Sequence, residues 1–231
     1  MIQVNNLSKT YNNTTVLHID HLVIPKGESF GLVGNNGAGK TTFFSLLLDL
    51  IAPSTGQITS NDVVIHTSEL WKNFTNAFLD ESFLVSYLTP DEYFNFIGEL
   101  RGLSKAETLA FIEPFQVVFN DEILGGKKYI RDLSKGNQKK VGIAAAFIGN
   151  PEVIILDEPF ANLDPTTQIR LKNLLKEIAA RKEVTMLISS HDLQHTIEVS
   201  NRIVALDKGK IVKDIKTDDN TMAELEALFA I

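Results

Sequence analysis

A glycine-rich segment near the start of the chain carries a lysine and a threonine that could bind phosphate. Residues 29–33 read SFGLV and predict a short buried strand, and residues 34–41 read GNNGAGKT. This is the G-x-x-x-x-G-K-[ST] pattern, and the apolar run that follows from Lys40 predicts a helix. The glycines let the backbone N–H groups of the loop point into one concavity and bind phosphate oxygens, and the helix adds its positive N-terminal end.

The segment therefore predicts a site for a nucleoside triphosphate. Lys40 would reach the β- and γ-phosphates, and Thr41 would hold Mg²⁺ through its hydroxyl. The alternative is an ordinary glycine-rich turn before a helix, but a turn does not need three glycines at this spacing followed by Lys-Thr. The residues expected to bind the nucleotide here are Gly34, Asn35, Asn36, Gly37, Ala38, Gly39, Lys40, Thr41 and Thr42.

The second segment with chemical potential is the acidic pair Asp157-Glu158, which follows four apolar residues and precedes Pro159. An acid at the carboxyl end of a strand can hold Mg²⁺, and ligands of open α/β sheets bind at that edge. Glu158 could polarise the water that attacks the nucleotide. In isolation the pair would indicate a solvated turn, and the phosphate loop earlier in the chain favours the catalytic interpretation.

The composition is ordinary for a soluble globular protein, with 44% hydrophobic and 22% charged residues in a chain of 231. This length allows one large α/β domain or two small ones. The net charge of −7 argues against broad nucleic-acid binding, and the absence of cysteine fits a reducing compartment. No apolar run reaches the roughly 18 residues of a membrane span, and the first residues lack the pattern of a signal peptide. We therefore expect a cytoplasmic protein.

The residues around the phosphate loop predict its framework. Residues 2–7, 15–19 and 22–24 predict an antiparallel β layer before the loop, and the very apolar helix from Lys40 is expected to stop before Pro53.

A change of composition follows. Phenylalanine recurs between residues 71 and 119, and helix starts are expected at Pro90 and after Ser104. A further helix should begin after Leu133 and end at Asn150. Most of the rings should form the core of a small helical subdomain, and a minority could line an exposed groove for a partner.

Five motifs in order, GNNGAGKT, LSKGN, IILDEP, ANLD and SSHD, resemble those of the ATP-binding subunit of an ATP-binding cassette (ABC) transporter. The resemblance covers essentially the whole chain. It implies an α/β fold: a P-loop NTPase core with a mostly parallel sheet, an N-terminal antiparallel β layer and an inserted α-helical subdomain. Residues 1–231 would form a single ABC ATP-binding domain, with 1–80 and 151–231 as the nucleotide-binding core and 81–150 as the helical subdomain. The implied activity is an ATPase that couples ATP hydrolysis to transmembrane transport.

The segment LSKGN resembles the family signature LSGGQ, from which Lys135 and Asn137 depart. The resemblance implies that Ser134, Gly136 and Asn137 approach the γ-phosphate of an ATP held by the other subunit, so that the active form is a dimer. Ser134 also fits an N-cap that satisfies the first backbone donors of its helix, and the two roles are compatible. Variants of the LSKGN kind resemble those of exporter-type subunits.

The resemblance gives roles to three further residues. Tyr11 resembles the aromatic residue that stacks on adenine; a turn aromatic that covers the β layer is the alternative. Asp164 in ANLD resembles the loop that links the two sites across the dimer, and it could instead cap the helix that follows it. His191 in SSHD resembles the histidine that contacts the γ-phosphate. The catalytic residues expected are therefore Glu158, His191 and Lys40.

One position departs from the family pattern. The family normally has Gln on the loop that enters the helical subdomain, where it touches Mg²⁺ and senses the membrane partner. Here Glu81 stands at that place, or Asp80 with a slip of one residue. A carboxylate can still ligate Mg²⁺, a hard cation that prefers oxygen. The implied cofactors are ATP and Mg²⁺, with Thr41, Asp157 and Glu81 as metal ligands.

The resemblance also implies partners. They are a polytopic membrane permease and a second ATPase subunit, either identical or paralogous, with no nucleic acid and with membrane contact only through the permease. The chain would then lie in the cytoplasm on the inner face of the cell membrane. A stand-alone ABC ATPase that acts on a scaffold or assembly complex is the alternative. A non-hydrolytic subunit is disfavoured by the intact Lys40, Asp157, Glu158 and His191.

Overall fold

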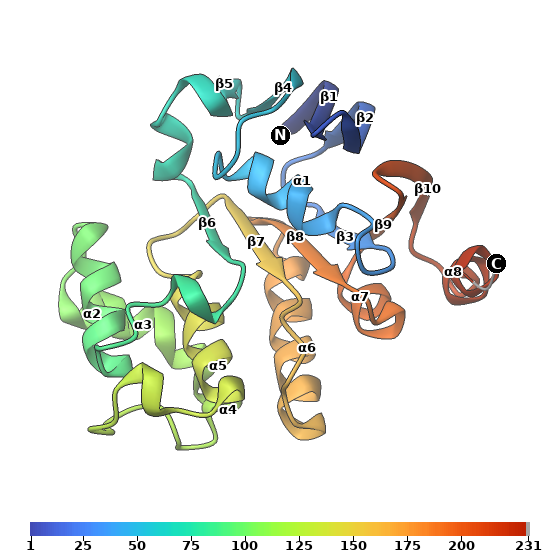
Figure 1. Ribbon diagram of the computed structural model, residues 1–231. Coiled ribbons are helices and arrows are strands. Elements are labelled where there is room, and N and C mark those ends of the chain that lie inside the picture. Colours follow the sequence, from blue (N-terminus) through green and yellow to red (C-terminus); the bar gives the residue numbers. More distant parts are fainter. Residues whose placement is uncertain (230–231) are drawn as a thin grey trace.

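Two β-sheets with one helix between them form the centre of the molecule (Figure 1). The computed structural model describes residues 1–229, so the last two residues of the expected domain lie outside the described part. The six-stranded sheet has the order β10 (Lys210–Lys216), β9 (Arg202–Asp207), β3 (Ser29–Val33), β8 (Thr185–Ser190), β7 (Val153–Asp157) and β6 (Thr75–Phe78). Its neighbouring strands are parallel except β10, which runs antiparallel to β9. The expected α/β fold with a mostly parallel sheet is confirmed.

The second sheet is the expected antiparallel layer. It has the order β2 (Thr14–Ile24), β1 (Ile2–Tyr11), β4 (Thr55–Ser60) and β5 (Val63–Val64). The prediction of two strands at 15–19 and 22–24 is wrong, because β2 is continuous. The irregularity lies in the partner strand, where Asn6 has a left-handed backbone with φ of 48° and the pairing of β1 with β4 shifts after Asn5.

Helices surround both faces of the larger sheet. The helices are α1 (Lys40–Leu47), α2 (Pro90–Leu100), α3 (Lys105–Ile112), α4 (Gln116–Phe119), α5 (Lys135–Ala145), α6 (Pro165–Ala180), α7 (Leu193–Val199) and α8 (Thr221–Phe229). Short 3₁₀ turns occupy Ile65–Thr67, Leu70–Asn73, Glu81–Phe83, Glu113–Phe115 and Ile130–Asp132. No helix within residues 1–229 combines the length and the apolar character needed to cross a bilayer.

The central strands β3, β7 and β8 of the larger sheet are buried on both faces, as is usual for parallel strands. On one face, Ile155 and Leu187 pack in the same cluster as Phe43 and Phe44 of α1 and the inner side of the antiparallel sheet. On the other face, Ile154 and neighbouring residues pack with α5 and α6. Helix α1 is therefore enclosed between the two sheets (Figure 1), which fixes the loop at its N-terminus.

Helices α2 to α5 lie beyond the β6 edge of the sheet and share an aromatic core (Figure 1). Phe94, Phe115 and Phe119 are fully buried there, whereas Phe83 and Phe96 are exposed. The expected aromatic core of the helical subdomain is present, and the role of the exposed rings in a groove for a partner stays a prediction.

Candidate nucleotide-binding and hydrolysis site

The loop from residue 34 to residue 39 joins β3 to α1 and depends on its glycines. A Cβ atom on Gly34 would lie 2.4 Å from the carbonyl oxygen of Leu206, and Gly39, the N-cap of α1, has a φ of 109°. Larger residues would therefore collide or be strained. The buried side chain of Lys40 folds back over the loop, and its Nζ donates a hydrogen bond of 2.7 Å to the carbonyl oxygen of Gly34.

A cavity of about 360 Å³ opens in front of this loop. Tyr11 at the end of β1 lies at its wall with 47% of its surface exposed, and the Lys9 ammonium lies 4.8 Å from the centre of the ring. An exposed aromatic face at the wall of a phosphate-binding cavity is suited to stacking on a nucleotide base. The lining residues are Tyr11, Val16, Asn36, Gly37, Ala38, Gly39, Lys40, Thr41, Thr42 and Glu158.

Asp157 ends β7 and faces the first turn of α1. Its Oδ2 accepts a hydrogen bond of 2.9 Å from the hydroxyl of Thr41, and its Oδ1 accepts one from the hydroxyl of Ser189 at the end of β8. The structure thus brings together Thr41 and Asp157, two expected metal ligands that are far apart in the sequence. The sequence analysis missed Ser189, which could have been found only from the register that pairs it with Asp157.

Glu158 is held in an unusual backbone conformation with φ of 49°. Its N–H donates to the carbonyl oxygen of Ser189 at 3.1 Å. Its Oε2 accepts a hydrogen bond of 3.2 Å from the hydroxyl of Ser190 and lies 2.8 Å from Nδ1 of His191. Glu158 and His191, both expected to be catalytic, are therefore in direct contact.

The signature residues lie at the start of α5. The Ser134 hydroxyl caps this helix and accepts the Asn137 N–H at 3.2 Å, as expected for an N-cap. A Cβ atom on Gly136 would lie 3.0 Å from the carbonyl oxygen of Asn162, so the signature packs closely against the ANLD loop. Ser134, Gly136 and Asn137 do not line the cavity in front of the chain's own phosphate loop, as far as the described residues show.

Asp164 caps α6. Its carboxylate accepts hydrogen bonds from the hydroxyl of Thr167 and, at 3.0 Å, from the Thr167 N–H. These two bonds lower the pKa of Asp164 below its usual value, and the bond from the hydroxyl has the larger effect. The capping role is therefore part of the fold within one chain.

Glu81 lies in a 3₁₀ turn after β6 and pairs with Lys139 of α5, with 3.8 Å between Oε1 and Nζ. Lys139 also donates a hydrogen bond of 2.8 Å to the carbonyl oxygen of Glu158. Burial lowers the pKa of Lys139, and the carboxylates of Glu81 and Glu158 partly oppose that shift. The place of Glu81 among the metal ligands stays a prediction, and the sequence analysis missed Lys139.

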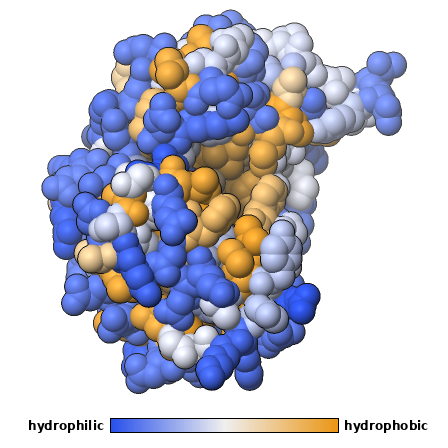
Figure 2. Space-filling view, turned by 90° about the vertical axis from the view of Figure 1, so that its left-hand side faces the viewer, coloured by the Kyte–Doolittle hydropathy of each residue, from blue (hydrophilic) through white to orange (hydrophobic). Residues whose placement is uncertain are grey.

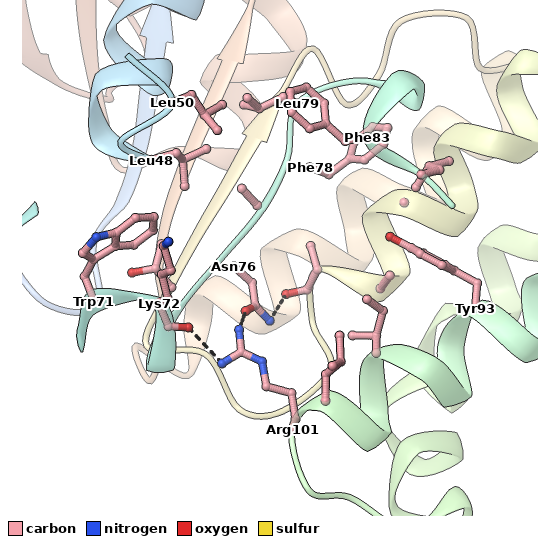
Figure 3. Close-up of a pocket in the computed structure, with 18 of the residues that line it drawn as sticks. Leu48, Leu50, Trp71, Lys72, Asn76, Phe78, Leu79, Phe83, Tyr93 and Arg101 are labelled. Carbon is pink, nitrogen blue, oxygen red and sulfur yellow. Dashed lines mark hydrogen bonds between the residues drawn. The ribbon is translucent and has the colours of Figure 1, made fainter. Parts of the chain in front are cut away.

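An apolar groove of about 470 Å³ lies on the side of the molecule that carries β6 and α2. Hydrophobic residues gather in a hollow of this face and polar residues surround it (Figure 2). Leu79 and Phe83 lie at one end of the groove and Trp71 lies across from Tyr93 (Figure 3). Arg101 joins the end of α2 to the residues around β6, because its guanidinium donates to the side-chain oxygen of Asn76 and to the backbone oxygen of Lys72 (Figure 3).

Comparison with known proteins identifies relatives of this chain by sequence and by structure. A match to the family described as ABC transporter covers residues 17–161. An uncharacterized ABC transporter ATP-binding protein of Methanocaldococcus jannaschii is 33% identical over 98% of this chain and 82% of its own length. The bacitracin transport ATP-binding protein BcrA of Enterococcus faecalis is 32% identical over 95% of this chain and 70% of its own length. A solved ATP binding subunit of an ABC transporter, 28% identical, superposes with a TM-score of 0.86 over 100% of this chain and 98% of its own.

The phosphate loop, the buried Asp157 and the adjacent Glu158 place the molecule in the class of P-loop nucleotide-hydrolysing proteins. More narrowly, the chain belongs to the ABC transporter family, as a nucleotide-binding ATPase of that family.

Proposed function

We propose that this chain dimerises on ATP, hydrolyses it with Glu158 as the base, and drives a separate polytopic permease that exports its cargo. The observation that carries the proposal is the apolar groove beside the Glu81 turn, because it gives a membrane partner a place to bind next to the hydrolysis site. The chain would then be cytoplasmic and would reach the inner face of the cell membrane only through the permease.

The groove has the properties of a docking surface for a helix. Phe83 is 57% exposed and Leu100 is 68% exposed at its edges, which is unfavourable in water and favourable under an apolar partner. The groove is lined by β6 on one side and by α2 and α5 on the other, so a partner seated in it would contact both parts of the molecule. We propose residues 81–150 as the helical subdomain and the remainder as the nucleotide-binding core.

Hydrolysis would be driven by positioning and charge stabilisation. Lys40 binds the phosphates, Glu158 orients the attacking water and accepts its proton, and His191 lies beside both Glu158 and the γ-phosphate position. The Thr41 hydroxyl and the Asp157 carboxylate fit Mg²⁺, since both are oxygen donors and lie 2.9 Å apart. When bound, the ion would neutralise charge on the β- and γ-phosphate oxygens.

The position of the signature supports dimerisation. Ser134 is exposed at the N-terminus of α5, where backbone donors and the helix dipole favour an anion. Because these residues do not line the chain's own cavity, a second cassette, identical or paralogous, would supply the phosphate that they bind. The LSKGN variant of the signature supports the export direction.

Affinity purification of the tagged chain from detergent-solubilised native membranes tests the proposal. We expect a stoichiometric polytopic membrane protein with the wild type, its loss with Phe83→Asp in the groove, and its retention with Val212→Asp at an exposed site on β10. Recovery only from the soluble fraction, with ribosomal or assembly proteins attached, would contradict the permease and favour the stand-alone ATPase. Transport of the cargo into inverted membrane vesicles would support export.

A further inference from the structure

A buried ammonium group lies between the catalytic acid and the turn that follows β6. Lys139 is only 5% exposed and lies on α5, two residues beyond the signature. Its Nζ bonds to the carbonyl oxygen of Glu158 and pairs with the carboxylate of Glu81. Buried lysines are rare unless their charge is matched, so this side chain needs an explanation beyond packing.

The first contact bears on the backbone of Glu158. A φ of 49° is unfavourable for a residue with a Cβ atom and persists only where the surroundings fix it. Both polar groups of the Glu158 backbone are bonded here. Its N–H donates to the carbonyl oxygen of Ser189 at 3.1 Å, and its own carbonyl oxygen accepts the Lys139 ammonium at 2.8 Å and the Ala161 N–H at 3.3 Å. Among the described residues, the Lys139 bond is the one that ties the Glu158 backbone to α5.

The second contact bears on Glu81. Its Oε1 is buried and has no hydrogen-bond partner among the described residues, and Lys139 lies 3.8 Å away. Four carboxylates act on the ammonium by charge, those of Glu81, Glu158, Asp157 and Asp80. Loss of the ammonium would leave these acids to repel one another in a site that must also accept a triphosphate.

We propose that Lys139 is a positioning residue for ATP hydrolysis: its ammonium holds the Glu158 backbone in the left-handed conformation, and Glu81 keeps the ammonium there by charge. This inference rests on the proposed role of Glu158 as the base. Lys139 acts through Glu158, so its loss should affect turnover far more than nucleotide binding.

The test uses purified full-length chain and measures kcat, KM, nucleotide affinity with a fluorescent ATP analogue, and thermal unfolding. We expect Lys139→Gln to lower kcat about 10- to 100-fold while the affinity changes less than about threefold. Lys139→Arg keeps a donor and a charge and should recover part of the lost turnover. Lys172→Gln is the matched control, because Lys172 is also buried and ion-paired, with Glu198 at 3.0 Å, away from the site. It should lower the unfolding temperature and leave kcat unchanged.

The double variant Glu81→Gln/Lys139→Gln tests the charge pairing. The double variant lacks the Glu81 carboxylate that Lys139→Gln leaves without a partner, so its kcat should be higher than that of Lys139→Gln alone. Additive losses of kcat would overturn the pairing. A normal kcat in Lys139→Gln would overturn the positioning role and leave the proposed function standing. So would a result in which Lys139→Gln and Lys172→Gln lower both the unfolding temperature and kcat to the same extent. Normal hydrolysis in Glu158→Gln would overturn both.

Discussion

Nδ1 of His191 lies 2.8 Å from Oε2 of Glu158, and the hydroxyl of Ser190 donates to the same carboxylate oxygen. An ionised carboxylate can only accept hydrogen bonds, so the contact assigns the proton of a neutral His191 to Nδ1. The other ring nitrogen, Nε2, is then left for a second partner. The His191 side chain is 59% exposed, so a second partner can approach the ring from solvent.

Replacement of Glu158 by Gln should separate binding from hydrolysis. The amide keeps the shape of the side chain but cannot accept the proton of the attacking water, so we expect kcat to fall about 10²- to 10⁴-fold with little change in ATP affinity. Size-exclusion chromatography with Mg²⁺ and ATP should show an accumulated dimer. Glu226→Gln on the exposed face of α8 makes the same chemical change and should hydrolyse ATP normally. Normal turnover in Glu158→Gln would exclude Glu158 as the base.

Replacement of His191 should lower turnover through the same carboxylate. His191→Ala removes both the contact with Glu158 and the group expected at the γ-phosphate, and we expect kcat to fall about 10²-fold. His191 is on the surface, so the midpoint of urea unfolding should move little. An unfolding midpoint lowered as strongly as kcat would instead indicate a structural role.

Much of this architecture could be predicted from local sequence. The expected strand at 29–33 and the helix start at Lys40 are confirmed, because buried strands and phosphate loops have strong local patterns. The helix starts at Pro90 and after Ser104 are also confirmed, and both helices begin with a capping box.

Features set by distant contacts could not be predicted. Strand β6 reads only TNAF and owes its conformation to pairing with β7. Helix α1 stops before Pro53 as expected, but it ends as early as Leu47, and the backbone turns left-handed soon afterwards at Asp49. Helix α5 ends at Ala145, before the expected Asn150. Lys139 lies in a polar stretch that predicts a solvated face, yet it is buried and contacts Glu81 after β6 and Glu158 after β7.

A glycine in the groove wall gives a stability prediction. A Cβ atom on Gly142 of α5 would lie 2.1 Å from the ring of Phe78, which is itself buried. Gly142→Ala should therefore lower the free energy of unfolding by about 1–3 kcal/mol, despite the better helix propensity of Ala. Gly126→Ala is the control, because its new Cβ would meet its nearest neighbour at 3.9 Å and should change stability little. Equal urea midpoints for the two variants would contradict the tight contact.

The cap on α6 gives a pH prediction. The pKa of Asp164 is lowered in the folded state by the Thr167 hydroxyl and N–H, so folding favours the ionised carboxylate. Its contribution to stability should be fully present above the unfolded pKa of about 3.9 and should be lost as the pH falls through the lower folded value. Asp164→Asn still accepts the capping bonds but does not titrate. The difference in urea midpoint between the wild type and this variant should shrink with acid, and a constant difference would contradict the assignment.

The hydrogen bond between Thr41 and Asp157 gives a metal prediction. If both oxygens ligate Mg²⁺, then Thr41→Val, which keeps the size and removes the hydroxyl, should weaken ATP binding in the presence of Mg²⁺. It should change the affinity little in EDTA, because the loop N–H groups and Lys40 still bind the phosphates. Thr41→Ser restores an oxygen and should restore the magnesium dependence. An affinity that Thr41→Val weakens equally with and without Mg²⁺ would show that the hydroxyl supports the loop rather than the ion. A titration of Mg²⁺ at fixed ATP concentration, monitored by isothermal titration calorimetry, distinguishes a metal-binding role of the hydroxyl from a structural one.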